Sequence, residues 1–208
     1  MGHTVVSDFT FCTVQYDSGD WDSAPLVSAN IIDSVARYTS IRVAPSGVTV
    51  PLGSRELMRY PLAYLTGHLP LRLSDLERRT LTEYCARGGL LFVDDHNHDI
   101  DGVFHKSATE ELARAVGPLR DLPNTHALYS SFFTFAEGPP ATSHELNGWG
   151  DNLVHTHLLA ALHGDRIAVL YSNKDYSSEW NFHPDNKRFL SIDNTKLAVN
   201  LVVYALTR

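Results

Sequence analysis

In the stretch "GGLLFVDDHNHD" (Gly88 to Asp99), a purely apolar run leads directly into two aspartates and two histidines. The four residues Leu90 to Val93 predict a strand that is buried on both faces, as strands of a parallel sheet are. Ligands of open α/β sheets bind beyond the carboxyl ends of the strands. The stretch therefore predicts a central parallel strand with a site at its exit, and an ordinary surface turn is the structural alternative.

Strands and helices alternate along most of the chain, which is typical of a parallel sheet covered by helices. A Ser-x-x-Glu capping box at Ser74 predicts a helix that ends at Gly88, and a second such pattern at Ser107 predicts another helix start. The expected strands are 9–16, 41–50, 60–68, 90–93, 151–162 and 166–172, and the expected helices are 26–39, 74–87, 108–116 and 195–206.

The composition indicates one soluble domain over residues 1–208 and excludes several classes of protein. The net charge is −7, and lysines and arginines are scattered, so no basic face for nucleic acid is expected. No apolar run is long enough to span a bilayer, and no signal peptide is recognisable. With only two cysteines, the chain is expected to be cytoplasmic and free of a disulfide framework.

Polar residues follow four of the predicted strands, and all four exits are expected to open on one edge of the sheet. His68 follows the third strand, directly after a glycine that lets the backbone approach a ligand closely. The residues that we expect to contact a substrate lie after the first and the last of these strands: Asp20, Trp21, Ser172, Asp175 and Trp180.

Histidine and aspartate at the exit of the central strand indicate metal chemistry. We predict that His68, His96 and His98 are metal ligands, because imidazoles two residues apart in extended chain point the same way. Asp94 and Asp95 are the predicted catalytic bases, with metal ligation, orientation of an imidazole and turn capping as alternatives.

A second His-x-His pair, His155 and His157, has two interpretations. The pair can hold a metal, or it can lie on the exposed face of an amphipathic strand. Eleven histidines in 208 residues produce about half of one such pair by chance, so the motif alone is weak.

Five segments together resemble a bacterial family of domains of unknown function that is grouped with the class I glutamine amidotransferase-like fold. They are "YDSGDWDSAP", "YPLAYLTGH", "LSDLERRTLTEYCARGGLLFVDD", "RIAVLYSNKDYSSEW" and "LAVNLVVYALT". The resemblance covers Phe9 to Thr207. It implies a flavodoxin-like three-layer α/β sandwich with a mainly parallel sheet and helices on both faces, and it implies no activity.

The chain departs from true amidotransferases at the nucleophile. In those enzymes a cysteine follows the strand that "GGLLFVDD" resembles, whereas here Asp94 and Asp95 occupy that turn. Cys12 falls inside a predicted strand and Cys85 inside a predicted helix, so both are expected to be buried structural thiols.

The sequence thus predicts a metal-dependent enzyme that hydrolyses a small polar molecule or peptide. The expected cofactor is a divalent zinc, iron or manganese ion, which would lower the pKa of a bound water and replace the missing thiol. Two alternatives stay open. One is a non-catalytic domain that binds a ligand or a protein, and the other is an iron- or copper-dependent redox enzyme.

Overall fold

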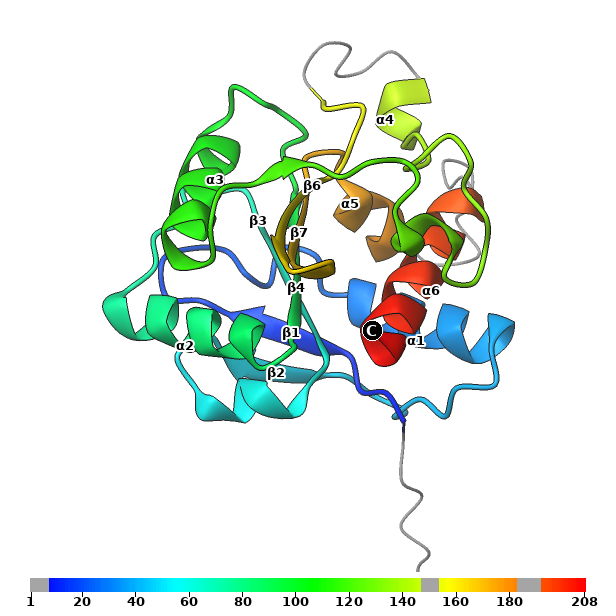
Figure 1. Ribbon diagram of the computed structural model, residues 1–208, viewed down its shortest axis with the longest axis horizontal. Helices are drawn as coiled ribbons and strands as arrows, with labels where there is room; N and C mark the ends of the chain where they lie inside the picture. Colours follow the sequence, from blue (N-terminus) through cyan, green and yellow to red (C-terminus); the bar gives the residue numbers. More distant parts are fainter. Residues whose placement is uncertain (1–7, 147–153, 183–191) are drawn as a thin grey trace, which may run out of the picture.

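A seven-stranded sheet with the order β2-β1-β3-β4-β7-β6-β5 forms the centre of the molecule (Figure 1). The structure is a computed structural model that describes residues 8–146, 154–182 and 192–208. β1, β2, β3, β4 and β7 are parallel, and β6 runs antiparallel to both β5 and β7. The strands are β1 (Cys12–Gln15), β2 (Val48–Pro51), β3 (Leu62–Gly67), β4 (Leu90–Asp95), β5 (Arg120–Asp121), β6 (Leu159–His163) and β7 (Arg166–Ser172). The predicted α/β class with a mostly parallel sheet is confirmed.

Helices pack against both faces of the sheet (Figure 1). Side chains of α1, α5 and α6 share one hydrophobic core with the sheet, and side chains of α2 and α3 share the other. The helices are α1 (Val27–Tyr38), α2 (Asp75–Ala86), α3 (Val103–Ala115), α4 (Ser143–Leu146), α5 (Tyr176–Asn181) and α6 (Ile192–Thr207), with 3-10 turns η1 (Arg55–Arg59) and η2 (Ala127–Ser130). No helix among the described residues has the length and apolar character needed to cross a membrane.

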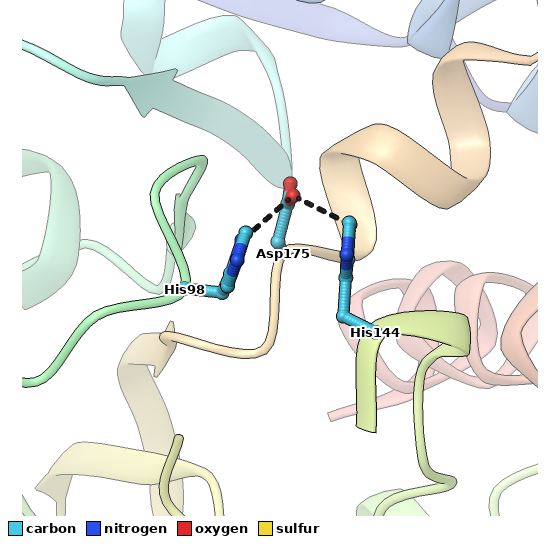
Figure 2. A group of neighbouring side chains, drawn as sticks. All are labelled: His98, His144 and Asp175. Atoms are coloured by element: carbon cyan, nitrogen blue, oxygen red, sulfur yellow. Dashed lines mark ion pairs between the residues drawn. The ribbon is translucent and has the colours of Figure 1, made fainter. Parts of the chain in front are cut away.

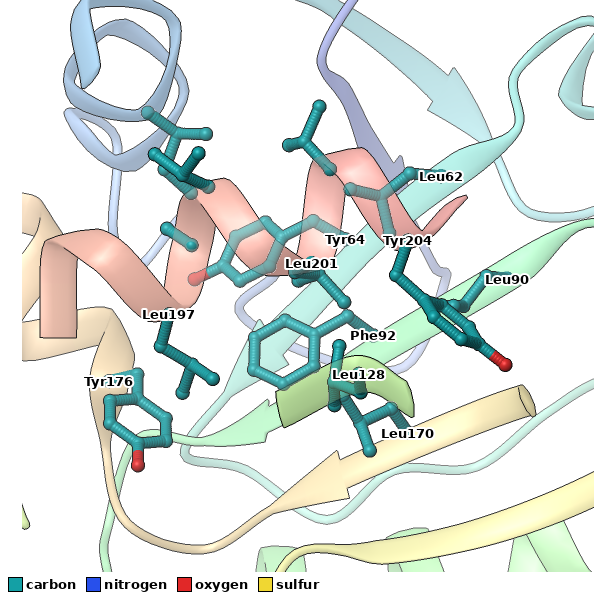
Figure 3. Close-up of a cluster of buried hydrophobic side chains, with 14 of the residues drawn as sticks. Leu62, Tyr64, Leu90, Phe92, Leu128, Leu170, Tyr176, Leu197, Leu201 and Tyr204 are labelled. Atoms are coloured by element: carbon teal, nitrogen blue, oxygen red, sulfur yellow. The ribbon is translucent and has the colours of Figure 1, made fainter. Parts of the chain in front are cut away.

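The two central strands are buried along their whole length, as the sequence predicts. β3 pairs with β4 in parallel, and all six residues of each strand are buried. Their side chains alternate between the two cores, because successive residues of a strand point to opposite faces. Figure 3 shows Leu90 and Phe92 in one hydrophobic cluster with Leu197 and Leu201 of α6. Burial of each such side chain contributes about 1.5–3 kcal/mol, which fixes the register of β4 and hence the place of its exit.

The capping box at Ser74 is confirmed. Ser74 Oγ accepts a hydrogen bond from Glu77 N at 3.3 Å, and Glu77 Oε2 accepts one from Ser74 N at 2.8 Å. The helix ends just before Gly88, whose φ of +107° requires a residue without a side chain. Local capping chemistry therefore sets both ends of α2.

The prediction that Ser107 starts a helix is wrong. α3 already begins at Val103, and Ser107 lies inside it with its Oγ donating to Val103 O at 2.7 Å. The same hydroxyl accepts a hydrogen bond from Leu71 N at 2.8 Å. A serine within a helix can bond back to the carbonyl four residues earlier, so a Ser-x-x-Glu pattern also occurs away from helix starts.

Two of the differences from the expected strand boundaries affect residues of the candidate site. β4 continues through Asp94 and Asp95, which therefore belong to the sheet rather than to the following loop. β6 begins only at Leu159, so His155 and His157 lie in the segment before it and not on a strand. The first residues of that expected strand, 151–153, lie outside the described residues.

Candidate functional site

The exits of β3, β4 and β7 lie side by side at one edge of the sheet. The parallel register places Gly67 opposite Asp95, and Asp94 opposite Ser172. The loops that follow these strands therefore leave the sheet at one level, as expected of a parallel sheet. This edge carries the candidate site.

Asp94 and Asp95, the last residues of β4, point to opposite faces of the sheet because they are neighbours in a strand. Asp94 Oδ2 accepts a hydrogen bond from Ser177 N at 2.6 Å, and Asp95 Oδ1 accepts one from Asn97 N at 2.9 Å. Burial raises the pKa of each carboxyl to about 7, and the charge of Asp175 adds to the effect at Asp94. Within the described residues, Asp94 Oδ1 and Asp95 Oδ2 have no hydrogen-bond partner.

Asp175 is the centre of the site and is held in an unusual conformation. It precedes α5 with φ 59° and ψ 51°, and it caps the helix by accepting a hydrogen bond from Ser178 N at 3.0 Å. Asp175 and His98 are the non-glycine residues with positive φ in the described part of the chain. Backbone strain of this kind costs about 1–3 kcal/mol and clusters at functional sites.

Three imidazoles surround the Asp175 carboxylate. The distance from His96 Nδ1 to Asp175 Oδ1 is 2.6 Å. Figure 2 shows His98 and His144 on either side of the carboxylate, with His98 Nδ1 at 3.4 Å and His144 Nε2 at 3.2 Å from Oδ2. The rings of His98 and His144 are stacked, with centroids 4.3 Å apart. One ligand atom from each of His98, His144 and Asp175 lies within 4.8 Å of the others, so the three can hold a metal ion.

The electrostatics of the cluster favour a charged carboxylate. Burial acts to raise the pKa of Asp175, but its contacts with His144, His96 and His98 outweigh it, so the pKa is lowered. The pKa of His144 is raised by its hydrogen bond to Asp175. Burial acts to lower the pKa of His96, yet the hydrogen bond and the charge of Asp175 raise it overall. Asp175 therefore supplies a buried negative charge to all three rings.

His68 is oriented by a second carboxylate, that of Asp20. The distance from His68 Nδ1 to Asp20 Oδ2 is 2.7 Å, and Asp20 also accepts hydrogen bonds from the backbone N–H groups of His68 and Leu69. Burial opposes ionisation of Asp20, but these hydrogen bonds lower its pKa overall. The glycine before His68 is required, since a Cβ at Gly67 would lie 2.1 Å from Tyr16 Oη and 2.9 Å from Asp20 Oδ1.

The structure brings some of the predicted site residues together and keeps others apart. The rings of His68 and His96 pack with centroids 4.3 Å apart, and Asp20 and Asp175 each bind one of them. Trp180 lies in the hydrophobic core, 4% exposed, and its Nε1 donates to Asn194 O.

The remaining two residues predicted to bind substrate also make contacts elsewhere than with the histidines. Ser172 is buried, and its Oγ accepts a hydrogen bond from Lys174 N at 3.0 Å. Trp21 is partly buried and packs against the core beneath α2 and α3. Among the residues predicted to bind substrate, Asp20 and Asp175 therefore belong to the histidine cluster, because their carboxylates contact the rings.

Sequence reasoning missed His144, which α4 carries to the cluster. α4 is fixed to the strand exits by an ion pair between Lys174 Nζ and Glu145 Oε1 at 2.5 Å. It is fixed to α5 because Glu179 Oε1 accepts a hydrogen bond from Ser143 Oγ at 2.5 Å. The one local signal is the Thr-x-x-Glu pattern at Thr142, since Glu145 accepts a hydrogen bond from Thr142 N at 2.7 Å.

His105 and His155 form a third ring pair of a different kind. Their centroids are 5.4 Å apart, and His105 Nδ1 contacts the Tyr171 hydroxyl at 2.8 Å in place of a carboxylate. Burial lowers the pKa of His105 to about 4 and also lowers that of His155. His157 is exposed. Among the described residues, no ion pair joins the two rings of the second His-x-His motif to one carboxylate.

Both cysteines are buried, as predicted. Burial raises the pKa of Cys12 and of Cys85 to about 12. A thiolate nucleophile is disfavoured at both positions, because the thiolate and not the thiol is the reactive form.

A family model described as a domain of unknown function (DUF4159) matches residues 10–206. The chain belongs to the DUF4159 family. No curated protein matches the chain. Membership in DUF4159 brings no activity with it, so the function has to be argued from the site.

Proposed function

We propose that the protein is a metal-dependent hydrolase that acts on a small polar molecule or peptide at the carboxyl edge of the sheet. The observation that carries the proposal is the convergence of His98, His144 and Asp175, each with a ligand atom within 4.8 Å of the others. Two imidazoles and a carboxylate are ligands that suit zinc, iron or manganese. Three protein ligands also leave a coordination position for water or substrate, as catalytic zinc sites do.

The distances within the cluster match the separation of two ligands on one metal ion. Two ligands of a tetrahedral ion with bonds of about 2.0–2.1 Å are about 3.3 Å apart. His144 Nε2 and His98 Nδ1 lie 3.2 and 3.4 Å from Asp175 Oδ2. Hydrogen bonds between charged partners are shorter, about 2.7–2.9 Å, and the contact of His96 with the other oxygen of Asp175 is short at 2.6 Å.

The chemistry that such an ion supplies is a hydroxide nucleophile, because a bound divalent ion lowers the pKa of water. The chain itself holds two cysteines that are both buried, so a thiol nucleophile is disfavoured. Asp94 and Asp95 remain the proposed bases, and each has a carboxylate oxygen without a partner among the described residues. Asp20, whose carboxylate contacts His68, lies on the loop where a polar substrate would enter.

We also propose that the fold is the flavodoxin-like three-layer sandwich of the class I glutamine amidotransferase-like superfamily. The two helical cores on opposite faces of the mostly parallel sheet support this assignment. In this proposal Asp94 and Asp95 replace the superfamily's cysteine turn at the exit of β4.

Metal analysis of the purified chain tests the proposed function. The wild-type protein is stripped with a chelator, dialysed against Zn²⁺, Mn²⁺ or Fe²⁺ and assayed for bound metal. We expect His144→Ala to lose one equivalent, and the matched control His163→Ala, at an exposed strand end, to lose none. Equal metal content in His144→Ala and wild type would overturn the proposed centre. Absence of metal from both would favour a non-catalytic binding domain, and oxygen consumption by an iron or copper form would favour a redox enzyme.

A further inference from the structure

We infer that the ring pair of His68 and His96 forms a second cation site, with the Nε2 atoms of both rings as ligands for a divalent transition-metal ion. This site lies next to the cluster of His98, His144 and Asp175 and is distinct from it. The inference goes beyond the proposed function, because it depends on different ligands and on a second ion.

The two rings are held together by the main chain. His68 follows β3 and His96 follows β4, and these strands are paired in the sheet. His96 N donates a hydrogen bond to Gly67 O at 3.2 Å, and Asn97 Nδ2 donates one to His68 O at 2.9 Å. The ring centroids lie 4.3 Å apart at an interplanar angle of 39°. The pair is therefore preorganised by the two strands and their exits.

Each ring is oriented by a carboxylate in the way that metal-ligating histidines are. His68 Nδ1 contacts Asp20 Oδ2 at 2.7 Å, and His96 Nδ1 contacts Asp175 Oδ1 at 2.6 Å. An ionised carboxylate only accepts hydrogen bonds, so Nδ1 carries the proton in both rings. The ring nitrogen left to bind a metal is then Nε2 in both rings, as in the carboxylate–histidine–metal arrangement.

The ligand atoms and their exposure define the class of ion. Two imidazole nitrogens suit Zn²⁺, Co²⁺, Ni²⁺ or Cu²⁺, whereas Mg²⁺ and Ca²⁺ prefer oxygen ligands. The His68 side chain is 41% exposed and that of His96 is 11% exposed, so solvent reaches one side of the pair. Water or a polar substrate group would complete the coordination on that side.

Asp175 contacts residues of both sites but is a proposed ligand only in the first. Its Oδ1 orients His96, while its Oδ2 faces His98 and His144. The two proposed ligand sets therefore share no atom. The ring pair of His105 and His155 lacks this orienting carboxylate, because His105 Nδ1 contacts a tyrosine hydroxyl instead. It is therefore not expected to bind a metal in the same way.

Zinc titration of the chelator-treated full chain, followed by calorimetry and by metal analysis, tests this inference. We expect two equivalents in wild type, one in His68→Ala, one in His144→Ala and none in the double variant. Asp20→Asn keeps the ligands and removes the orienting charge, so the second site should weaken about 10–100-fold while the first is unchanged. His155→Ala is the histidine control and should retain two equivalents.

The outcomes separate this inference from the proposed function. A single equivalent that His144→Ala abolishes and His68→Ala retains would overturn the second site and leave the proposed centre intact. A single equivalent that only His68→Ala abolishes would support the second site and overturn the centre at Asp175. Circular dichroism checks that each variant folds, and His68→Gln replaces His68→Ala if the latter does not. Two full equivalents in a folded His68→Gln protein would overturn the inference.

Discussion

Replacing Asp95 by asparagine should change how the stability of the metal-free protein depends on pH. Asp95 is fully buried at the end of β4, and burial raises the pKa of its carboxyl from 3.8 to about 7. Asparagine has nearly the same shape and can still accept the hydrogen bond that Asn97 N donates to Asp95 Oδ1 at 2.9 Å. The substitution therefore removes the ionisation while it keeps the main contact.

The sign and the size of the effect follow from this raised pKa. Between pH 3.8 and about 7 the folded protein holds a proton on Asp95 that the unfolded chain has lost. The contribution of Asp95 to stability is thus present at low pH and is lost as the pH rises through about 7. The whole difference corresponds to about 4 kcal/mol, of which about 2.5 kcal/mol falls between pH 5 and pH 8.

Urea denaturation of both proteins at pH 5 and pH 8, with chelator present, measures this difference. We expect the free energy of unfolding of Asp95→Asn, relative to wild type, to rise by about 2.5 kcal/mol from pH 5 to pH 8. Asp101→Asn is the matched control, because Asp101 is exposed in the loop after β4, and it should show no such rise. Parallel pH profiles for Asp95→Asn and wild type would refute the argument that burial holds this carboxyl neutral.

Three further substitutions or reactions test separate parts of the structure. A disulfide reagent such as DTNB should not modify Cys12 or Cys85 in the native protein, because burial raises both pKa values to about 12; rapid native labelling would contradict this. Ser74→Ala should lower the free energy of unfolding by about 1 kcal/mol through loss of the cap of α2, and an unchanged urea midpoint would contradict it. Gly67→Ala should destabilise the fold by about 1–3 kcal/mol, since the new Cβ would lie 2.1 Å from Tyr16 Oη; wild-type stability would show that the strand exit tolerates a side chain.

The central sheet was predictable because its strands carry their own signal. Leu90 to Val93 are apolar on both faces, and only a strand covered by helices on both sides buries such a run. The capping box at Ser74 was predictable for the same reason, since cap and partner lie three residues apart. Ser107 shows the limit of that motif, because its hydroxyl bonds back within α3.

The site was predictable only where strand order determines it. His68 and His96 follow neighbouring strands, so a parallel sheet brings their rings together. His144 comes from a short helix that no periodic pattern marks, and long-range contacts of Lys174 and Glu179 fix its position. Contacts of this kind depend on tertiary packing, which spacing along the chain does not encode.

Anomalous diffraction from crystals grown with zinc tests the central claim most directly. A peak at the zinc edge should appear between His98, His144 and Asp175, with ion-to-ligand distances of about 2.0–2.2 Å to Nδ1, Nε2 and Oδ2. A protein that binds zinc in solution but shows its anomalous peaks away from these three side chains would contradict the account.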